Sequence, residues 1–204
     1  YGMGELSNED LLKYTHDRAE HVRRWAVKLL FDQGEPENYS ERMVAMASGD
    51  DSPAVLLAIA SAMQAVKPVN RWPLAEAIVH RDVSRGDEML ALMIWYAIEP
   101  LITEDRQRFL ALALSSPNPI LQEFILRRAS EGPQPNLEDV LAAIGSCSGD
   151  RLPMVQGVLD ALAGQGQQPE PARWGAFYST TSRTENSELK SCLVRLAGIF
   201  GDQN

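Results

Sequence analysis

Five stretches of the chain share one pattern of apolar residues and recur at an almost constant distance. In each stretch, apolar residues stand at offsets of zero, three, four, seven and eight positions, with one polar exception, Arg128 in the fourth stretch. This is the pattern of a helix with one apolar stripe. The stretches begin at Val22, Val55, Met89, Leu121 and Val155. Successive starts are therefore 33, 34, 32 and 34 residues apart. A fixed period of this size predicts stacked helical repeats.

A second apolar segment precedes each of these stretches. These segments cover residues 6–15, 40–48, 73–80, 104–114 and 136–145. Ser52-Pro53 and Asn118-Pro119 each place a capping side chain before a proline, and proline suits the first helical position. Short polar turns, such as Gly49-Asp50-Asp51, separate the two helices of a pair. The sequence predicts an all-α fold of about five helix–turn–helix repeats, arranged as an α-α superhelix, with no strand.

The pattern changes after residue 163. Residues 164–187 are rich in Gly, Pro, Gln, Ser and Thr, and they predict an irregular connection whose aromatic residues pin it to the repeats. Helical spacing then resumes. We expect one domain, with a repeat array over residues 1–163, a connection over 164–188 and a helix over 189–204 that closes the apolar end of the array.

Charge and composition narrow the class of partner. The net charge is −9 and the sequence pI is near 4.9, so we expect no binding to nucleic acid and no contact with an anionic membrane surface. Cys147 and Cys192 form no CxxC motif and predict two small core residues rather than a disulfide or a zinc site. The sequence begins at Tyr1 without a methionine, and we expect a fragment of a longer protein.

The sequence contains no motif of catalytic chemistry. His16 and His21 stand five residues apart and diverge by about 140° around a helix, unlike the pair in the zinc motif H-E-x-x-H. Gly164-x-Gly166 follows a helix and lacks the third glycine of a dinucleotide-binding loop. His80 is expected on the surface. We therefore expect neither a cofactor nor a metal, and we predict that this chain is not itself an enzyme.

Several charged and aromatic residues are candidates for binding a partner. Arg24 and Lys28 lie off the apolar stripe that begins at residue 22, where a solvated face is the alternative. Trp25 lies on this stripe and is expected in the core, with recognition as the alternative. Trp95 and Glu99 belong to a segment that is apolar on nearly all sides, and a buried Glu99 would need an arginine from a neighbouring repeat.

Two further arginine groups complete the candidates. Arg127 and Arg128 are adjacent, and Arg128 occupies a stripe position where a buried or bridging ion pair is expected. Arg71-Trp72-Pro73 is expected to open and staple a helix.

The helix pairs resemble HEAT repeats of the HEAT/ARM-like solenoid class. In HEAT repeats an acidic turn precedes a Val-Arg pair at the start of the second helix, as Asp17 precedes Val22-Arg23 here. The period alone also fits TPR repeats, but the tryptophan, glycine and alanine positions of the TPR pattern are absent.

A more specific resemblance is carried by five segments: VRRWAVKLLFD (22–32), RWPLAEAI (71–78), LMIWYAIEPL (92–101), FILRRAS (124–130) and LAGIFGD (196–202). They resemble the HEAT-repeat region of the PVC-type haem-binding CxxCH proteins of planctomycetes and verrucomicrobia, also called putative membrane-bound dehydrogenases. In that family a sugar-dehydrogenase-like β-propeller precedes the repeats and a c-type cytochrome domain follows them. The resemblance implies an exported, periplasmic protein whose redox chemistry lies outside this chain, and no catalytic residue carries over.

These observations lead to one expected function and one class of alternative. We expect a non-catalytic scaffold that binds protein, either the flanking domains of its parent or an external partner, through the face formed by the second helices. The alternative is a HEAT-like enzyme or small-ligand-binding solenoid. A DNA glycosylase-like version would need a basic face and a catalytic acid, and a phycobilin lyase-like version would need a roomy apolar groove.

Overall fold

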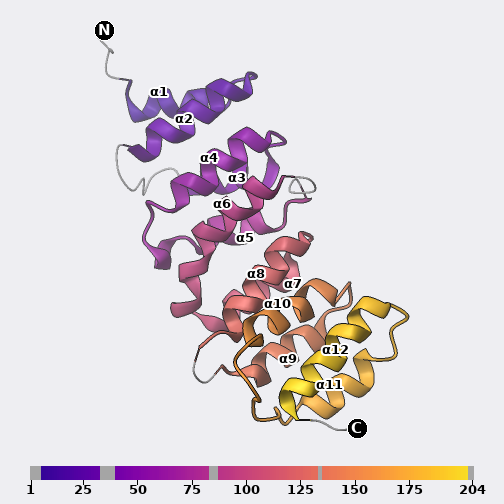
Figure 1. Ribbon diagram of the computed structural model, residues 1–204. Helices are drawn as coiled ribbons and strands as arrows, with labels where there is room; N and C mark the ends of the chain where they lie inside the picture. The colour runs from indigo at the N-terminus through magenta and orange to yellow at the C-terminus, as the bar shows by residue number, and fades with distance from the viewer. Residues whose placement is uncertain (1–5, 33–39, 83–86, 133–134, 202–204) are drawn as a thin grey trace. The chain divides into compact units, whose positions relative to one another are not determined.

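The computed structural model describes residues 6–32, 40–82, 87–132 and 135–201. These residues form twelve α-helices and no strand, so the predicted all-α class is confirmed for the part of the chain described (Figure 1). The chain divides into two compact units, residues 1–104 (unit 1) and residues 105–204 (unit 2). A single continuous array of both units stays a prediction.

Unit 1 contains three helix pairs. They are α1 (Asn8–Tyr14) with α2 (Glu20–Asp32), α3 (Ser40–Gly49) with α4 (Pro53–Met63), and α5 (Trp72–Val79) with α6 (Glu88–Ile98). The short 3₁₀ helices η1 (Pro68–Asn70) and η3 (Glu99–Thr103) flank the third pair. Helix α4 packs against both α2 and α6, while α3 packs against α5 (Figure 1). The second helices of the pairs therefore form one layer, and first helices α3 and α5 form another.

Unit 2 repeats this two-layer arrangement. Its pairs are α7 (Arg106–Ser115) with α8 (Pro119–Ser130), α9 (Leu137–Ser146) with α10 (Leu152–Leu162), and α11 (Trp174–Thr181) with α12 (Ser187–Phe200). Helix α10 packs against α8 and α12, and α9 packs against α7 and α11. Helices α8 and α10 approach closely at Gly157, where a Cβ atom would lie 2.3 Å from the carbonyl oxygen of Glu123.

The prediction of an irregular connection over residues 164–187 is wrong for residues 174–181, which form α11. The Trp174 side chain is fully buried, and its ring centroid lies 4.9 Å from that of Phe200 on α12. Helices α11 and α12 are therefore a sixth pair rather than a lone closing helix. The sequence does contain the signal, because Leu189 follows Val155 by 34 residues and starts the same set of offsets. That set is Leu189, Cys192, Leu193, Leu196 and Ala197, all of them buried.

In five of the pairs, a short polar residue in the turn between the two helices marks the start of the second helix. Its side chain accepts a hydrogen bond from the amide two residues later, at the entry to the second helix. We call it the turn residue. The turn residues with this bond are Asp17, Asp50, Ser116, Asp150 and Thr184. Counting from the turn residue gives equivalent positions in different pairs.

The predicted helix caps are confirmed. The Ser52 side chain accepts a hydrogen bond from the Val55 amide, and the Asn118 side chain accepts from two amides of α8. Gly201 ends α12 at a φ of 73°, a left-handed conformation that favours glycine.

Arginines tie the ends of neighbouring helices together. The buried guanidinium of Arg71 donates hydrogen bonds to the carbonyl oxygens of Gln64 at 3.0 Å, Val66 at 2.6 Å and Ala97 at 2.8 Å. Burial lowers the pKa of Arg71, but an arginine remains cationic at neutral pH. The predicted helix start at Arg71 is confirmed, and its side chain also satisfies backbone acceptors that helices leave unpaired.

An ion pair joins the first two pairs of unit 1. Arg23 donates to both carboxylate oxygens of Asp50, at 2.7 and 2.8 Å, and the two side chains are 17% and 7% exposed. Burial acts to raise the pKa of Asp50, but the hydrogen bonds from Arg23 and from the Ser52 amide outweigh it and hold the pKa below its ordinary value. In unit 2, Arg106 instead donates to the carbonyl oxygens of Ala129 and Asn136.

Candidate functional site

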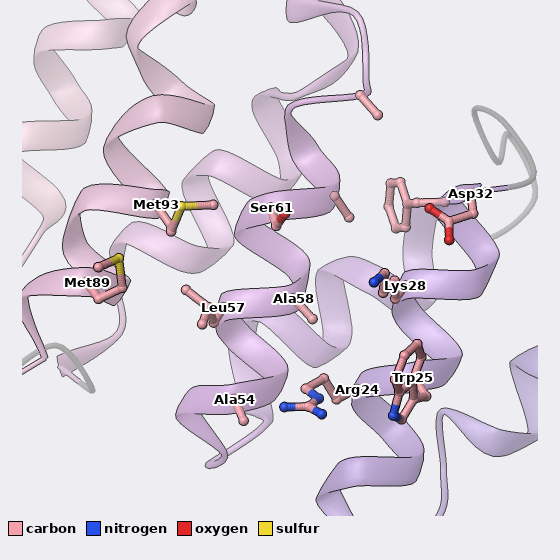
Figure 2. Close-up of a pocket in the computed structure, with 13 residues that line it drawn as sticks. Arg24, Trp25, Lys28, Asp32, Ala54, Leu57, Ala58, Ser61, Met89 and Met93 are labelled. Atoms are coloured by element: carbon pink, nitrogen blue, oxygen red, sulfur yellow. The ribbon is translucent and has the colours of Figure 1, made fainter.

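The second helices of unit 1 line an open groove with a volume of about 470 Å³ (Figure 2). Helix α2 contributes charged and aromatic side chains to one wall. Helix α4 contributes mostly small side chains to the floor, and α6 contributes two methionines to the opposite wall. The volume falls in the range of known binding sites, and the mixture of an apolar floor with a few charged groups is typical of them.

The α2 wall is formed by Arg24, Trp25 and Lys28, with Asp32 at its far end. These residues lie beside the core face of α2, which is formed by Ala26, Val27, Leu30 and Phe31. The Lys28 ammonium lies 5.0 Å from the centroid of the Trp25 ring, within range of a cation–π contact. Figure 2 shows the Arg24 side chain extending from α2 toward Ala54 on α4.

The prediction that Trp25 packs in the core is wrong, because its side chain is 49% exposed. The stripe that begins at residue 22 is adjacent to the true core face and shares only Ala26 and Leu30 with it. Because α2 carries apolar residues over a wide arc, the sequence pattern cannot separate the centre of the buried face from its edge. Trp25 lies at that edge, where it lines the groove.

Small residues make the floor of the groove accessible. Ala54, Ala58 and Ala62 stand one helical turn apart along α4, and all three are half-buried. Leu57 and Ser61 project beside them (Figure 2). Since alanine adds only a methyl group, another chain can approach the α4 backbone closely along this line.

Helix α6 supplies Met89 and Met93 to the opposite wall. The predicted stripe placed both in the core with Tyr96, but Met89 is 58% exposed and Tyr96 is 52% exposed. The buried residues are instead Leu90, Ala91, Ile94, Ala97 and Ile98. Since α6 is apolar on nearly all sides, packing against α4 and α5 decides which face is buried, and the sequence period does not.

The charge along the groove is uneven. Arg24 and Lys28 stand one turn apart, and neither makes an ion pair within the described ranges. Asp32 stands one further turn along α2. The wall is therefore basic over its first two turns, in a chain whose net charge is −9.

Trp95 and Glu99, the other candidates of unit 1, do not line the groove. Both are half-buried, and Glu99 is the first residue of η3, directly after α6. The expected pairing of Glu99 with an arginine of a neighbouring repeat stays a prediction.

Arg127 and Arg128 belong to unit 2, at the end of α8. Both lie near the Glu131 carboxylate, at 3.4 Å from Arg127 and 3.6 Å from Arg128. Their side chains are 52% and 37% exposed, so Arg128 forms an ion pair as predicted but not a buried one, and the bridging alternative stays a prediction. A stripe position near the last turn of a helix allows a long side chain to reach solvent.

A polar group on the second helices of unit 2 is not indicated by any sequence motif. Gln156 donates a hydrogen bond to Asp160 at 2.7 Å and accepts one from the Cys192 thiol at 3.2 Å. Burial, together with the nearby Asp160 carboxylate, raises the pKa of Glu123. Burial also raises the pKa of Cys192, which keeps this thiol protonated and unreactive. Only the repeat register, which places Glu123 and Gly157 at equivalent positions, could have pointed to this region.

The remaining residues considered for chemistry lie apart. His16, His21 and His80 are all exposed, as expected for His80. Cys192 is a buried free thiol, as predicted, whereas Cys147 is only half-buried at the end of α9. Over residues 6–32, 40–82, 87–132 and 135–201, no group of three or more His, Cys, Asp or Glu side chains could hold a metal ion.

The sequence matches no family model, and no curated protein or solved structure shows significant similarity to it. Within the described residues, none of the helices combines the length and the hydrophobicity that a membrane crossing requires.

Proposed function

We propose that this chain is a non-catalytic HEAT-like α-α superhelix that acts as a scaffold and binds another protein through the groove of unit 1. The observation that carries the proposal is the groove itself. Large apolar side chains, Trp25 and Met89, are about half exposed beside a floor of small residues. Exposed apolar surface with a central aromatic side chain is typical of protein-binding sites.

The Arg23–Asp50 pair supports the HEAT-like part of the proposal. It joins the second helix of one pair to the turn residue of the next, 27 residues later. In a stacked array each pair contacts only its neighbours, so a bond between adjacent pairs of this kind stabilises the stack. Among helical repeats, the acidic turn and the Val-Arg start favour the HEAT class.

We further propose that the chain is the central part of a larger exported redox protein of the PVC-type CxxCH class. The scaffold would join a dehydrogenase-like propeller to a c-type cytochrome domain, and the groove would contact one of them. The five segments quoted above support this parentage.

Two measurements test the proposal. Sequencing the reading frame on both sides should find a propeller-encoding segment upstream and a CxxCH motif downstream, and their absence would remove the redox parent. Each flanking domain would then be expressed separately and titrated with this chain by isothermal calorimetry. Saturable binding of one domain supports the scaffold. Binding of neither, at the highest soluble concentration, contradicts a contact between the groove and those domains.

One observation favours a second candidate, a small apolar ligand held in the groove. Its volume of about 470 Å³ would accommodate a drug-sized molecule. A lyase-like chain would bind an open-chain tetrapyrrole, and absorbance titration would show a saturable spectral shift that Ala58→Trp abolishes. The glycosylase-like alternative predicts salt-dependent binding to DNA, which the net charge of −9 disfavours.

A further inference from the structure

We propose that the groove of unit 1 binds an acidic amphipathic helix, whose apolar side chains lie on the α4 floor and whose carboxylates pair with Arg24 and Lys28. This inference rests on the proposed protein-binding function and specifies the chemistry of the partner. Three features of the groove carry it: the charge of one wall, the small residues of the floor and the length over which the walls run.

The charge of the α2 wall selects the sign of the partner. Arg24 and Lys28 are exposed, lie one turn apart and make no ion pair in the part of the chain that the structure describes. Lys28 is positioned over the Trp25 ring at 5.0 Å, which favours an extended ammonium at the groove. A partner helix with two acidic residues one turn apart would match both cations. Asp32 directs those carboxylates toward the Arg24 end of the wall, because it would repel them at its own end.

The floor and the opposite wall select a helix with one apolar face. The line of Ala54, Ala58 and Ala62 leaves room for large side chains to reach α4. Met89 and Met93 are flexible and adapt to the shape of the side chains that they contact. Trp25 supplies a large, rigid anchor of the kind that contributes most to binding. Apolar residues at three- and four-residue spacing on one helix face fit this surface.

The length of the groove fits about two turns of such a helix. The residues of α2 that line it run from Arg24 to Asp32, which corresponds to about 12 Å along the helix axis. Two turns present apolar residues at the first, fourth or fifth, and eighth positions, which is the usual set of anchors for a helix in a groove.

A display library of helical peptides tests the inference and requires no identified partner. Peptides of about 16 residues, long enough to form a helix, would be selected on the intact chain and counter-selected on the Arg24→Glu/Lys28→Glu variant. The enriched peptides should carry Asp or Glu one turn apart beside an apolar face. The affinity of the best peptide should fall at least tenfold in the double variant, fall with added salt, and be lost when Ala58→Trp fills the floor.

A matched charge reversal controls for net charge. Lys190→Glu/Arg195→Glu changes two exposed residues of α12 by the same amount and should leave the affinity unchanged. Circular dichroism would show that both double variants remain helical.

The outcomes separate this inference from the proposed function. Selection of basic or uncharged peptides, equal binding by the double variant, or no enrichment at all overturns the acidic-helix partner. If the flanking domains nevertheless bind the wild-type chain and the Arg24→Glu/Lys28→Glu variant equally well, the scaffold function stands without this site. If a tetrapyrrole saturates the groove and no peptide is enriched, the groove is a small-ligand site and this inference is wrong.

Discussion

The second helices of the two units follow the same repeat spacing, but those of unit 1 enclose a groove and those of unit 2 pack closely against each other. Seven residues after the turn residue, unit 1 has Arg24 and Leu57, both of which line the groove. At the same position unit 2 has Glu123 and Gly157, where the backbones of α8 and α10 approach each other. The period fixes where each helix lies, and the size of one side chain per repeat decides whether neighbouring second helices enclose a groove or close on each other.

The charges of the two units differ in the same region. In unit 1 an ion pair joins Arg23 to Asp50, and the pKa of Asp50 lies below its ordinary value. In unit 2 the corresponding residue of α10 is the neutral Gln156, and the pKa of nearby Glu123 lies above its ordinary value. Lowering the pH should therefore decrease the stability of unit 1 through protonation of Asp50. It should remove the cost of a charged Glu123 in unit 2.

The largest effect is expected at the close contact of unit 2. Gly157→Ala would place a methyl group 2.3 Å from a backbone oxygen of α8, so the helices must separate. Overpacking against the backbone should lower the free energy of unfolding by about 3 kcal/mol in urea denaturation followed by circular dichroism. Gly198→Ala is the matched control, since its added methyl group would meet no atom within 4 Å beyond its chain neighbours and the nearby backbone of its own helix. It should stabilise the chain by up to about 1 kcal/mol. Equal effects of both changes would contradict the close contact.

Removing the Arg71 guanidinium tests how much its hydrogen bonds to backbone carbonyl oxygens contribute to the stability of unit 1. Arg71→Leu leaves the carbonyl oxygens of Gln64, Val66 and Ala97 without this donor. We expect a loss of about 2–3 kcal/mol, because buried acceptors without partners are costly. Arg18→Leu, at an exposed position, is the control and should change the stability little. A similar small change at Arg71 would show that water replaces the guanidinium.

Asp50→Asn tests the ion pair of unit 1 and its dependence on pH. The folded chain lowers the pKa of Asp50, so its contribution is present above the unfolded pKa of about 3.9 and is lost as pH falls through the lower folded pKa. At pH 7 the variant should be less stable by about 2 kcal/mol. The difference from the wild-type chain should shrink as pH falls below about 3.9 and Asp50 becomes protonated. A pH-independent difference would assign the effect to packing rather than to the charge.

Glu123→Gln tests the opposite pH dependence in unit 2. The folded chain raises the pKa of Glu123, so the stability that this residue contributes is present below its unfolded pKa and is lost as pH rises through the folded pKa. The variant should therefore be more stable than the wild-type chain at pH 7, by about 0.5 kcal/mol because the side chain is partly exposed. The gain should vanish near pH 3, and a gain that persists there would contradict the assignment to charge.

The smallest change is expected on the floor of the groove. Ala58→Leu adds its side chain into open space and should alter the stability by less than about 0.5 kcal/mol. Ala60→Leu, on the fully buried face of the same helix, should cost about 1–3 kcal/mol in the same urea titration. If both changes are equally costly, the groove is closed in solution.

The sequence predicted the helices well and their faces less well. The apolar period located the second helices of the first five pairs, and the apolar segments before them located the first helices. Capping residues such as Ser52 and Asn118 mark where helices start. The pattern missed α11, whose short segment is surrounded by Gly, Pro and Gln, although Trp174, Phe177 and Thr181 are buried on one face. A composition typical of loops concealed a helix that tertiary packing stabilises.

The candidate site was only partly predictable. Arg24 and Lys28 were identified because charged residues beside an apolar stripe are visible in sequence, and they line the groove. Trp25 and Met89 were assigned to the core because hydrophobicity does not distinguish a buried residue from one at the edge of a hollow. Arg127 and Arg128 lie on a different unit, which a repeat pattern cannot reveal.

The bonds of Arg71 have a mechanical consequence. One guanidinium connects carbonyl oxygens that precede α5, those of Gln64 and Val66, with that of Ala97 at the end of α6. A force that pulls α4 away from the α5–α6 pair loads the two bonds to Gln64 and Val66 together, whereas the bond to Ala97 lies within the pair and keeps α5 attached to α6. Under tension, the third pair of unit 1 should therefore detach as one cooperative step and appear as a single rupture in a force–extension trace.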